Sequence, residues 1–483
     1  MGGHKKLIHF LRADPAPGSA LSSPRSFSSN DSSVSDDDGY NSSPSSFPAS
    51  AASSPSRYSP PKSPWAATTH LPGLGADGSA ATGLIASLVK EDGKVYSLAA
   101  AGDVLYTGTD SENVRVWRDR RELAGFRTGS GLVKAIVVAA GGRIFTGHQD
   151  GKVRVWRADA ADPAVHRRVG SLPALGDYLV SSVNPSSYVA LQAPRRRRRA
   201  VWLRHADAVS CLSLDEPAGL LYSGSWDRTF KVWRVSDSRC LESVPAHDDA
   251  VNTVAAAGFD GLVLTGSADG TVKVWRREQP APGSGDRTRH VLERVLREGD
   301  GAVTAVAVCP EARAVYVGSS DGLVACWRWG LDGEPRLGGV LVGHRMAVMC
   351  LAVSGRVVVS GSADRTLCVW RRDDGPDDDR CRHARLAVLA GHTGPVKCVA
   401  VAAADDEGCY DGGERRFVVY SGSLDGSVKV WRLSEDRPLE PPPAVITEPA
   451  TPSMPALLES EAWTPRRTVA LAPPPELKRV AAA

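Results

Sequence analysis

Serine, aspartate and arginine side chains stand close together in the stretch SGSWDRTFKVW, from Ser223 to Trp233. Together with His205 they are the residue types of nucleophilic catalysis, in which an imidazole accepts the proton of a hydroxyl group. The same stretch alternates apolar and polar residues and ends on tryptophan, as a buried β-strand does. Recurrence distinguishes the two interpretations, because a catalytic constellation occurs once in a chain whereas a fold element is repeated.

The stretch recurs, which favours the interpretation as a fold element. Aligned on the final tryptophan, seven copies read YTGTDSENVRVW, FTGHQDGKVRVW, YSGSWDRTFKVW, LTGSADGTVKVW, YVGSSDGLVACW, VSGSADRTLCVW and YSGSLDGSVKVW. Their tryptophans are Trp117, Trp156, Trp233, Trp275, Trp327, Trp370 and Trp431, at successive spacings of 39, 77, 42, 52, 43 and 61 residues. The short spacings match a repeat of roughly 40–45 residues, and the long ones indicate insertions. Period-two alternation predicts β-strands.

A second feature precedes four of the copies: histidine followed four residues later by valine, in HADAV, HDDAV, HRMAV and HTGPV. With these features the repeats resemble WD40 repeats over about residues 83–435, although every copy ends Trp-Arg in place of Trp-Asp. The resemblance implies an all-β, seven-bladed β-propeller with four antiparallel strands in each blade. Within that family, the HADAV copy, with SSVNPSSYV upstream, resembles the plant WD-repeat proteins of the Jingubang type, which regulate pollen germination and growth.

The resemblance also assigns the histidine, hydroxyl, aspartate and tryptophan of a copy to one hydrogen-bonded structural tetrad. The complete sets are His205, Ser223, Asp227 and Trp233; His247, Thr265, Asp269 and Trp275; His344, Ser360, Asp364 and Trp370; and His392, Ser421, Asp425 and Trp431. In blades 1, 2 and 5 the histidine position holds Glu91, Gly129 and Gly299, and Ser111 and Val317 replace the aspartate of blade 1 and the hydroxyl of blade 5. We expect these three blades to be held mainly by strand pairing and apolar packing, and to be the softer ones.

Composition divides the chain into a tail, the repeats and a second tail. Residues 1–78 are rich in Ser, Pro, Ala and Gly, and residues 436–483 are rich in proline, so both are predicted to be disordered. The propeller is assigned to residues 79–435, with an insertion at residues 157–197 of blade 2 rather than an eighth blade. Because a propeller must close, the segment GLIASLV, Gly83 to Val89, is predicted to supply the missing outer strand of blade 7.

Bulk properties argue against several function classes. The net charge of +3 on 483 residues predicts no nucleic-acid or membrane surface, and no apolar run is long enough to cross a bilayer. Nine cysteines without CxxC or Cys/His clustering indicate buried thiols rather than a disulfide frame or a zinc site. We therefore expect a soluble, intracellular protein without metal, cofactor or catalysis. The resemblance to the Jingubang type implies both cytoplasm and nucleus as its location.

Binding is then expected on the faces of the propeller. The resemblance places the residues beside the first-strand valine, and those before the turn aspartate, on the top rim around the channel. These positions are Tyr96, Asp110, Lys134, Gln149, Ser210, Trp226, Asn252, Ala268, Thr304, Ser320, Met349, Lys397 and Leu424. The large side chains suit an interface with a partner protein, such as a transcription factor, and the two lysines suit acidic partner residues. An alternative is that Trp226 only packs on the neighbouring blade.

Three function classes remain open. The leading one is a non-enzymatic scaffold for regulatory proteins, by resemblance a negative regulator of pollen germination and tube growth, acting as a monomeric propeller within a complex. A second is a substrate receptor of a cullin ubiquitin ligase, although the expected Trp-Asp-x-Arg is altered by Arg118 and only blade 1 keeps its arginine, Arg120. A third is RNA association through Arg195, Arg196, Arg197, Arg198 and Arg199, a block that equally suits nuclear import or a solvated loop.

Overall fold

The computed structural model describes residues 83–89, 93–159, 161–174, 176–179, 188–191, 198–201, 203–278, 288–373, 382–403 and 416–434. The two predicted tails, residues 1–78 and 436–483, lie outside the described residues, as does Glu91. The predicted disorder of the tails therefore stays a prediction.

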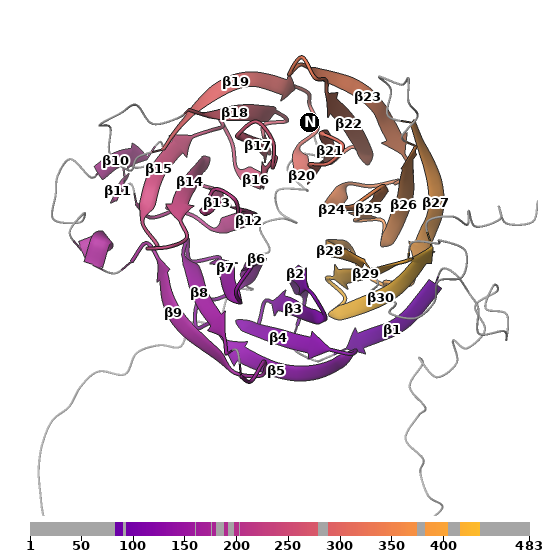
Figure 1. Ribbon diagram of the computed structural model, residues 1–483, viewed down its shortest axis with the longest axis horizontal. Coiled ribbons are helices and arrows are strands. Elements are labelled where there is room, and N and C mark those ends of the chain that lie inside the picture. Colours follow the sequence, from indigo (N-terminus) through magenta and orange to yellow (C-terminus); the bar gives the residue numbers. More distant parts are fainter. Residues whose placement is uncertain are drawn as a thin grey trace, which may run out of the picture. The chain divides into compact units, whose positions relative to one another are not determined.

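Seven four-stranded antiparallel sheets form a ring around a central channel, which confirms the predicted seven-bladed propeller (Figure 1). Blade 1 contains β2 (Val95–Ala101), β3 (Val104–Thr109), β4 (Asn113–Arg118) and β5 (Arg121–Arg127); blade 2 contains β6 (Val133–Ala139), β7 (Arg143–His148), β8 (Val153–Ala158) and β9 (His166–Leu172). Blade 3 contains β12 (Val209–Asp215), β13 (Leu220–Ser225), β14 (Thr229–Arg234) and β15 (Cys240–Pro245); blade 4 contains β16 (Val251–Ala256), β17 (Leu262–Ser267), β18 (Val272–Glu278) and β19 (Arg289–Arg297).

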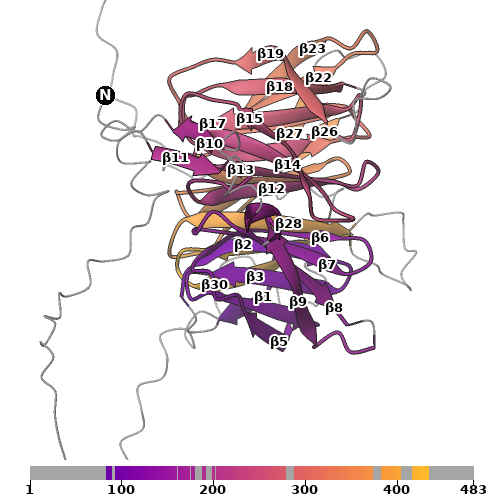
Figure 2. The ribbon, with the colours of Figure 1, turned by 90° about the vertical axis from the view of Figure 1, so that its left-hand side faces the viewer.

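The remaining blades follow the same order from the channel outward. Blade 5 contains β20 (Val303–Cys309), β21 (Ala314–Ser319), β22 (Leu323–Trp329) and β23 (Pro335–Val342); blade 6 contains β24 (Val348–Ser354), β25 (Val357–Ser362), β26 (Thr366–Asp373) and β27 (Arg382–Ala390). Blade 7 contains β28 (Val396–Ala403), β29 (Arg416–Ser423), β30 (Ser427–Ser434) and β1 (Gly83–Val89). Seen from the side, the blades built on β2–β5 and on β16–β19 lie at opposite ends of the ring (Figure 2).

The hydrophobic core lies between neighbouring blades. Phe145 and Val155 of blade 2, for example, belong to the same buried cluster as Leu221 and Trp233 of blade 3. Strand β13 is buried at every residue because blades cover both of its faces, and the same is true of β17, β21 and β25. Each of these strands begins with at least three apolar residues, as strands covered on both faces usually do, and ends with a buried Gly-Ser pair.

The repeated glycine and the repeated valine of the sequence meet between blades. A Cβ atom on Gly224 would lie 2.9 Å from Val251 Cγ1 of the next blade, closer than packed carbon atoms approach. The same approach recurs at every blade junction, in the pairs Gly108–Val133, Gly147–Val209, Gly266–Val303, Gly318–Val348, Gly361–Val396 and Gly422–Val95. Glycine is therefore required at this position so that the innermost strand of the following blade can pack against it.

The ring closes through the strand that the sequence predicted. Strand β1 pairs antiparallel with β30, so that Leu84 faces Trp431 and Leu88 faces Val428. The last junction in the ring, Gly422 against Val95, then joins blade 7 to blade 1. The N-terminal end of the described chain thus completes the C-terminal blade, which covers the outer edge of β30.

The segment that we assigned to an insertion, residues 157–197, needs correction. Strand β9 lies within this segment and is the outer strand of blade 2. After it come a single helical turn at residues 176–179 and a separate hairpin of β10 (Tyr188–Leu191) and β11 (Arg198–Val201). Strand β9 has no recognisable sequence pattern, because its side chains are mostly exposed or half-buried and it lacks the alternation of an inner strand.

Candidate protein-interaction site

The recurring polar residues of blade 3 form one continuous chain of hydrogen bonds. His205 Nδ1 lies 2.9 Å from Asp227 Oδ2, and His205 Nε2 lies 2.8 Å from Ser223 Oγ. The indole N–H of Trp233 donates to the same oxygen of Ser223 at 2.8 Å. Because the Nδ1–H donates to the carboxylate, Nε2 is left to accept the proton of the hydroxyl. Both the proton and the oxygen of Ser223 are therefore engaged inside the blade, and Ser223 is not available as a nucleophile.

The other three complete sets have the same geometry. The histidine Nδ1 to carboxylate distances are 3.0 Å for His247–Asp269, 3.0 Å for His344–Asp364 and 3.1 Å for His392–Asp425. The tryptophan N–H donates to Thr265, Ser360 and Ser421 at 2.8, 3.3 and 2.8 Å, respectively. Since the arrangement recurs with the blades and does not line the central cavity, it acts as internal scaffolding.

The turn aspartates are ionised by their surroundings. Burial raises the pKa of the Asp227 carboxyl, but its interaction with the Nδ1–H of His205, the charge of Lys231 and the hydrogen bond from Thr229 oppose this and hold the pKa below the ordinary range of aspartate. The same carboxylate accepts bonds from the backbone N–H groups of Ala206 and Thr229 and from the Thr229 hydroxyl. The carboxylate is thus saturated with donors, which removes the cost of burying an unpaired charge.

Blades 1 and 2 keep more polar contacts than we expected. Trp117 donates to Thr107, and Trp156 donates to Thr146, each at 3.0 Å. In blade 2 the histidine comes from β7, where His148 Nε2 lies 2.8 Å from the Thr146 hydroxyl. A hydroxyl therefore still receives each indole N–H in these two blades, and the expectation that strand pairing and apolar packing mainly hold them stays a prediction.

In blade 5, which lacks the tetrad histidine, an arginine side chain makes the hydrogen bonds at the junction with blade 4. Val317 offers no hydroxyl, and Arg297 from the outer strand of blade 4 takes part in the bonds at this junction. Its guanidinium donates to the Ser319 hydroxyl at 3.2 Å and to the carbonyls of Gly270 and Gly301. One planar side chain with several donors thus binds the turns of two neighbouring blades.

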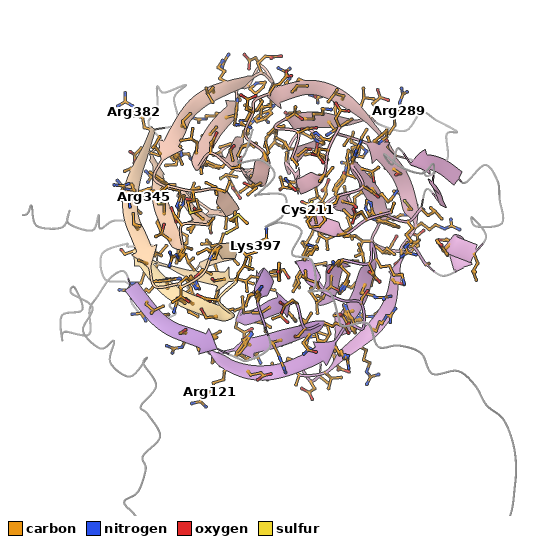
Figure 3. All side chains as sticks on the ribbon, turned by 180° about the vertical axis from the view of Figure 1, so that it is seen from behind. Arg121, Cys211, Arg289, Arg345, Arg382 and Lys397 are labelled. Carbon is orange, nitrogen blue, oxygen red and sulfur yellow. The ribbon has the colours of Figure 1, made fainter. Side chains whose placement is uncertain are left out.

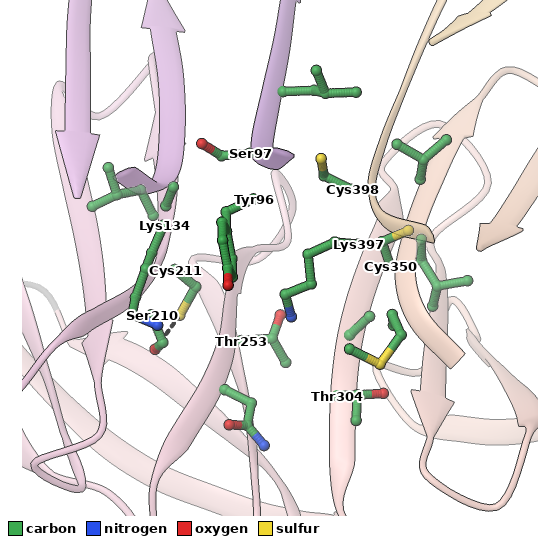
Figure 4. Close-up of a pocket in the computed structure, with 18 of the residues that line it drawn as sticks. Tyr96, Ser97, Lys134, Ser210, Cys211, Thr253, Thr304, Cys350, Lys397 and Cys398 are labelled. Carbon is green, nitrogen blue, oxygen red and sulfur yellow. Dashed lines mark hydrogen bonds between the residues drawn. The ribbon is translucent and has the colours of Figure 1, made fainter. Parts of the chain in front are cut away.

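A cavity of about 260 Å³ occupies the central channel and is lined by residues of all seven blades (Figure 4). Eight of the thirteen predicted rim residues line it: Tyr96, Lys134, Ser210, Trp226, Asn252, Thr304, Met349 and Lys397. From behind, Lys397 and Cys211 lie toward the centre of the ring, whereas Arg121, Arg289 and Arg382 lie at its periphery (Figure 3).

A β-bulge in each innermost strand turns these side chains into the channel. The pairing register shifts directly after the first valine, between Val95 and Ser97 in β2 and between Val396 and Cys398 in β28, for example. The bulged residue has no partner in the ladder, and bulges commonly re-aim a side chain in this way. The seven bulged residues, here called the bulge ring, are Tyr96, Lys134, Ser210, Asn252, Thr304, Met349 and Lys397.

The predicted positions before the turn aspartate behave differently. Asp110, Gln149, Ala268, Ser320 and Leu424 do not line the cavity; Asp110 and Gln149 are exposed and Ala268 is buried. Trp226 is the one residue of this set that lines it, and its ring lies 4.0 Å from Lys134 Nζ of blade 2. Trp226 thus packs on the neighbouring blade, as the alternative interpretation held, and also contributes to the cavity wall.

The bulge ring is less exposed than we expected at three positions. Tyr96, Thr304 and Met349 are only 6%, 8% and 4% accessible, because they lie against the channel wall rather than on an open rim. The lining next to the bulges, which includes Ser97, Cys211, Thr253, Cys350 and Cys398, was not predicted. These residues can be located in the sequence, because each stands two positions after the first valine of its innermost strand.

Burial controls the electrostatics of the channel. It lowers the pKa of Lys134 to about 7, with Lys397 adding to the effect and Asp207 opposing it. The pKa of Lys397 is also lowered by burial, and burial raises the pKa of Cys350 to about 12. This cysteine is therefore protonated at neutral pH, which makes it a poor nucleophile and metal ligand.

Other site classes find no counterpart in the part of the chain that the structure describes. It contains no group of three His, Cys, Asp or Glu side chains placed to hold a metal ion. No helix there has the length and apolar character needed to span a bilayer. Arg195, Arg196 and Arg197 lie outside the described residues, while Arg198 and Arg199 belong to β11.

Comparison with known proteins identifies the repeats. The family model "WD domain, G-beta repeat" matches residues 197–234, 238–276, 336–371 and 384–432. These segments contain the tryptophans of the four complete tetrads, Trp233, Trp275, Trp370 and Trp431, whereas the tryptophans of blades 1, 2 and 5 lie outside them.

Similar proteins share parts of the chain. The mouse WD repeat- and FYVE domain-containing protein 4 is 27% identical over 188 residues, which are 30% of this chain and 6% of that protein. Cell division control protein 4 of Candida albicans is 29% identical over 140 residues, 26% of this chain and 18% of that protein. Mitochondrial division protein 1 of Emericella nidulans is 31% identical over 238 residues, 47% of this chain and 31% of that protein.

The chain therefore spans less than a third of the length of each of these three relatives. Four segments of this chain thus match the WD domain, G-beta repeat, and the described part of the chain forms a ring of seven blades.

Proposed function

We propose that this protein is a non-enzymatic scaffold that binds a segment of another protein at the mouth of its central channel. The observation that carries the proposal is the bulge ring. In the innermost strand of every blade, one residue is left out of the pairing ladder and its side chain lines the channel. The polar tetrads are occupied with internal bonds and are therefore not available for recognition.

The chemistry of the channel suits a protein segment. Tyr96, Trp226 and Met349 provide large aromatic and thioether surfaces, which are enriched where interfaces are strongest. Lys134 and Lys397 add positive charge next to these surfaces. An apolar anchor with an acidic neighbour is therefore the kind of partner segment that we propose for this site.

The cellular role is a finer proposal that rests on the sequence resemblance alone. By its likeness to the Jingubang type, we propose that the scaffold is a negative regulator of pollen germination and tube growth, acting in cytoplasm and nucleus through bound regulatory proteins. The stretch that supports it is the HADAV copy with its upstream segment SSVNPSSYV. Germination of pollen lacking the protein tests this role, because unchanged germination and tube growth would remove it.

The two alternatives have weaker support. For a cullin-ligase receptor, the adaptor-binding arginine after Trp117 would need a free aspartate neighbour, yet Arg118 stands there and pairs with Asp103 at 2.5 Å. For RNA association through Arg195–Arg199, Arg195, Arg196 and Arg197 lie outside the described residues, and the net charge of +3 on the whole chain adds no support. The scaffold function is therefore the one the geometry favours.

Affinity purification from the native cell tests the scaffold function directly. The intact protein is compared with the double variant Trp226→Ala, Lys397→Glu and with Lys94→Glu, a matched control that changes an exposed lysine outside the cavity lining. We expect the double variant to lose partners that the control retains. A full set of partners on the double variant would contradict binding at the channel mouth.

A further inference from the structure

The hydrogen-bond donors of the bulge ring fall into two arcs. In blades 3, 4 and 5 the donors are already used, because each bonds to the backbone carbonyl of the first valine in the next blade. Ser210 Oγ donates to the Val251 carbonyl at 2.5 Å and Asn252 Nδ2 to the Val303 carbonyl at 2.8 Å. Thr304 donates in the same way to Val348. These three side chains fasten neighbouring blades together and have little capacity left for a ligand.

The opposite arc is formed by Lys397, Tyr96 and Lys134, which stand on the consecutive blades 7, 1 and 2. We call these three residues the cationic arc. Their donors, unlike those of Ser210, Asn252 and Thr304, are not bonded to a carbonyl of the next blade within the described chain. Among the described residues, neither ammonium group has a carboxylate partner and none of the three side chains donates a hydrogen bond to a protein acceptor. Lys134 instead lies over two aromatic rings, at 4.0 Å from that of Trp226 and 5.9 Å from that of Tyr96.

The three donor groups face one space. The Tyr96 ring lies between the two lysine side chains, and Lys397 extends toward it (Figure 4). The two ammonium groups are close enough that Lys397 lowers the pKa of Lys134. The ammonium groups of Lys134 and Lys397 thus lie in one cavity of about 260 Å³ without a negatively charged partner among the residues that the structure describes. An anion bound between them would supply that partner and accept their hydrogen bonds.

We propose that the cationic arc binds one phosphate monoester on a side chain of the partner protein. The proposal deepens the scaffold function, on whose site it rests, by naming the chemical group that enters the channel. A phosphate monoester carries a charge of about −1.5 to −2 and three terminal oxygens at neutral pH. The two ammonium groups match this charge, and the two ammonium groups with the phenol of Tyr96 provide one donor group for each of the three oxygens. A carboxylate, with one charge and two oxygens, would leave one cation and one donor without a partner.

Calorimetric titration of the full chain at pH 6.5 with phenyl phosphate, a phosphate monoester, tests the proposal, with acetate as the singly charged comparison. We expect phenyl phosphate to bind and acetate to bind at least fivefold more weakly. Lys134→Gln and Lys397→Gln should each weaken phenyl phosphate binding at least fivefold, Tyr96→Phe should weaken it severalfold, and the surface control Lys94→Gln should leave it unchanged.

Several results would overturn the proposal: no phenyl phosphate binding, phenyl phosphate binding no tighter than that of acetate, or equal phenyl phosphate affinity in the two lysine variants and the intact protein. The unfolding temperatures of the variants are measured in parallel, so that loss of the fold is not mistaken for loss of the site. If Lys134→Gln melts early, Lys397→Gln and Tyr96→Phe carry the same test.

The outcome is separable from that of the scaffold function. A partner that needs the channel residues yet remains bound after phosphatase treatment would keep the scaffold and overturn the phosphate inference. Phenyl phosphate binding that is lost in the lysine variants, without any channel-dependent partner in the cell, would support the inference and remove the scaffold function.

Discussion

The phenol oxygen of Tyr222 in blade 3 lies 3.2 Å from Nε2 of His290 on the outer strand of blade 4. The other ring nitrogen, Nδ1, lies 2.7 Å from the carboxylate of Glu242, so the Nδ1–H donates there and Nε2 accepts from the tyrosine. This tyrosine–histidine hydrogen bond between neighbouring blades is here called a clasp. A clasp also joins blades 1 and 2, through Tyr106 and His166 at 3.3 Å, and blades 5 and 6, through Tyr316 and His383 at 2.9 Å. The odd-numbered blades 1, 3 and 5 thus each hold the next blade through one tyrosine.

Removing one clasp should weaken the ring measurably. Tyr222→Phe leaves the buried Nε2 of His290 without its donor, and we expect it to lower the free energy of unfolding by about 1–3 kcal/mol. Tyr420, the equivalent residue of blade 7, has no hydrogen bond from its phenol within the described chain, so Tyr420→Phe is the matched control. Urea unfolding of the two variants decides the point, and equal losses in both would show that the clasp contributes nothing.

The hydroxyl of the tetrad should be structural rather than catalytic. Ser223→Ala removes the acceptor of Trp233 and the donor to His205 at once, so we expect a loss of about 2–4 kcal/mol in the free energy of unfolding. The exposed Ser236→Ala should change it by less than about 0.5 kcal/mol. The measurement is urea unfolding, and a fully stable Ser223→Ala protein would contradict the scaffolding role.

His148 should make the protein sensitive to mild acid. Burial lowers its pKa to about 4, with Arg154 and Arg168 adding to the effect and Asp150 opposing it. Because the folded pKa lies below the unfolded value of about 6.5, the folded state is favoured above pH 6.5 and loses stability as the pH falls toward 4. The loss at pH 4 from this residue is on the order of 2–3 kcal/mol.

His148→Ser tests this dependence, since the other blades carry serine or threonine at the equivalent position. The variant lacks the titrating group, so its unfolding temperature should fall less between pH 6.5 and 4.5 than that of the intact protein. Parallel curves for the two proteins over this range would mean that His148 does not titrate as its burial requires.

Ring closure predicts a sharp limit for truncation at the N-terminus. A protein without residues 1–75 keeps β1 and should unfold at the temperature of the full chain. A protein without residues 1–90 lacks β1, exposes the edge of β30 and should unfold or aggregate. Thermal unfolding monitored by circular dichroism distinguishes them, and the closure would be unnecessary for stability if both truncated proteins melted alike.

Much of the ring followed from the sequence because its signals are local. The Gly-Ser turn, the alternating strand before each tryptophan and the closing segment Gly83–Val89 can be recognised from residue types and spacing alone. The tetrads were assigned through the family resemblance, and the distances around His205 and Asp227 agree with that assignment.

What the sequence did not yield depends on contacts across blades. The glycine of one copy and the valine of the next, such as Gly224 and Val251, can be paired only once the blades are placed side by side. His148 was missed because it reaches the shared hydroxyl from a strand rather than from the preceding loop. The burial of Tyr96 and Met349 follows from bulges, which break the alternation on which strand prediction relies.

The central claim is that the tetrads hold the blades while the channel mouth binds the partner. One comparison tests it directly: partner affinity and unfolding temperature, both measured for Lys397→Glu and for Asp227→Asn. We expect Lys397→Glu to lose the partner at least tenfold with an unfolding temperature close to that of the intact protein, and Asp227→Asn to unfold at a lower temperature while its folded fraction keeps the partner. The opposite pattern, with partner affinity lost in Asp227→Asn and kept in Lys397→Glu, would contradict the claim.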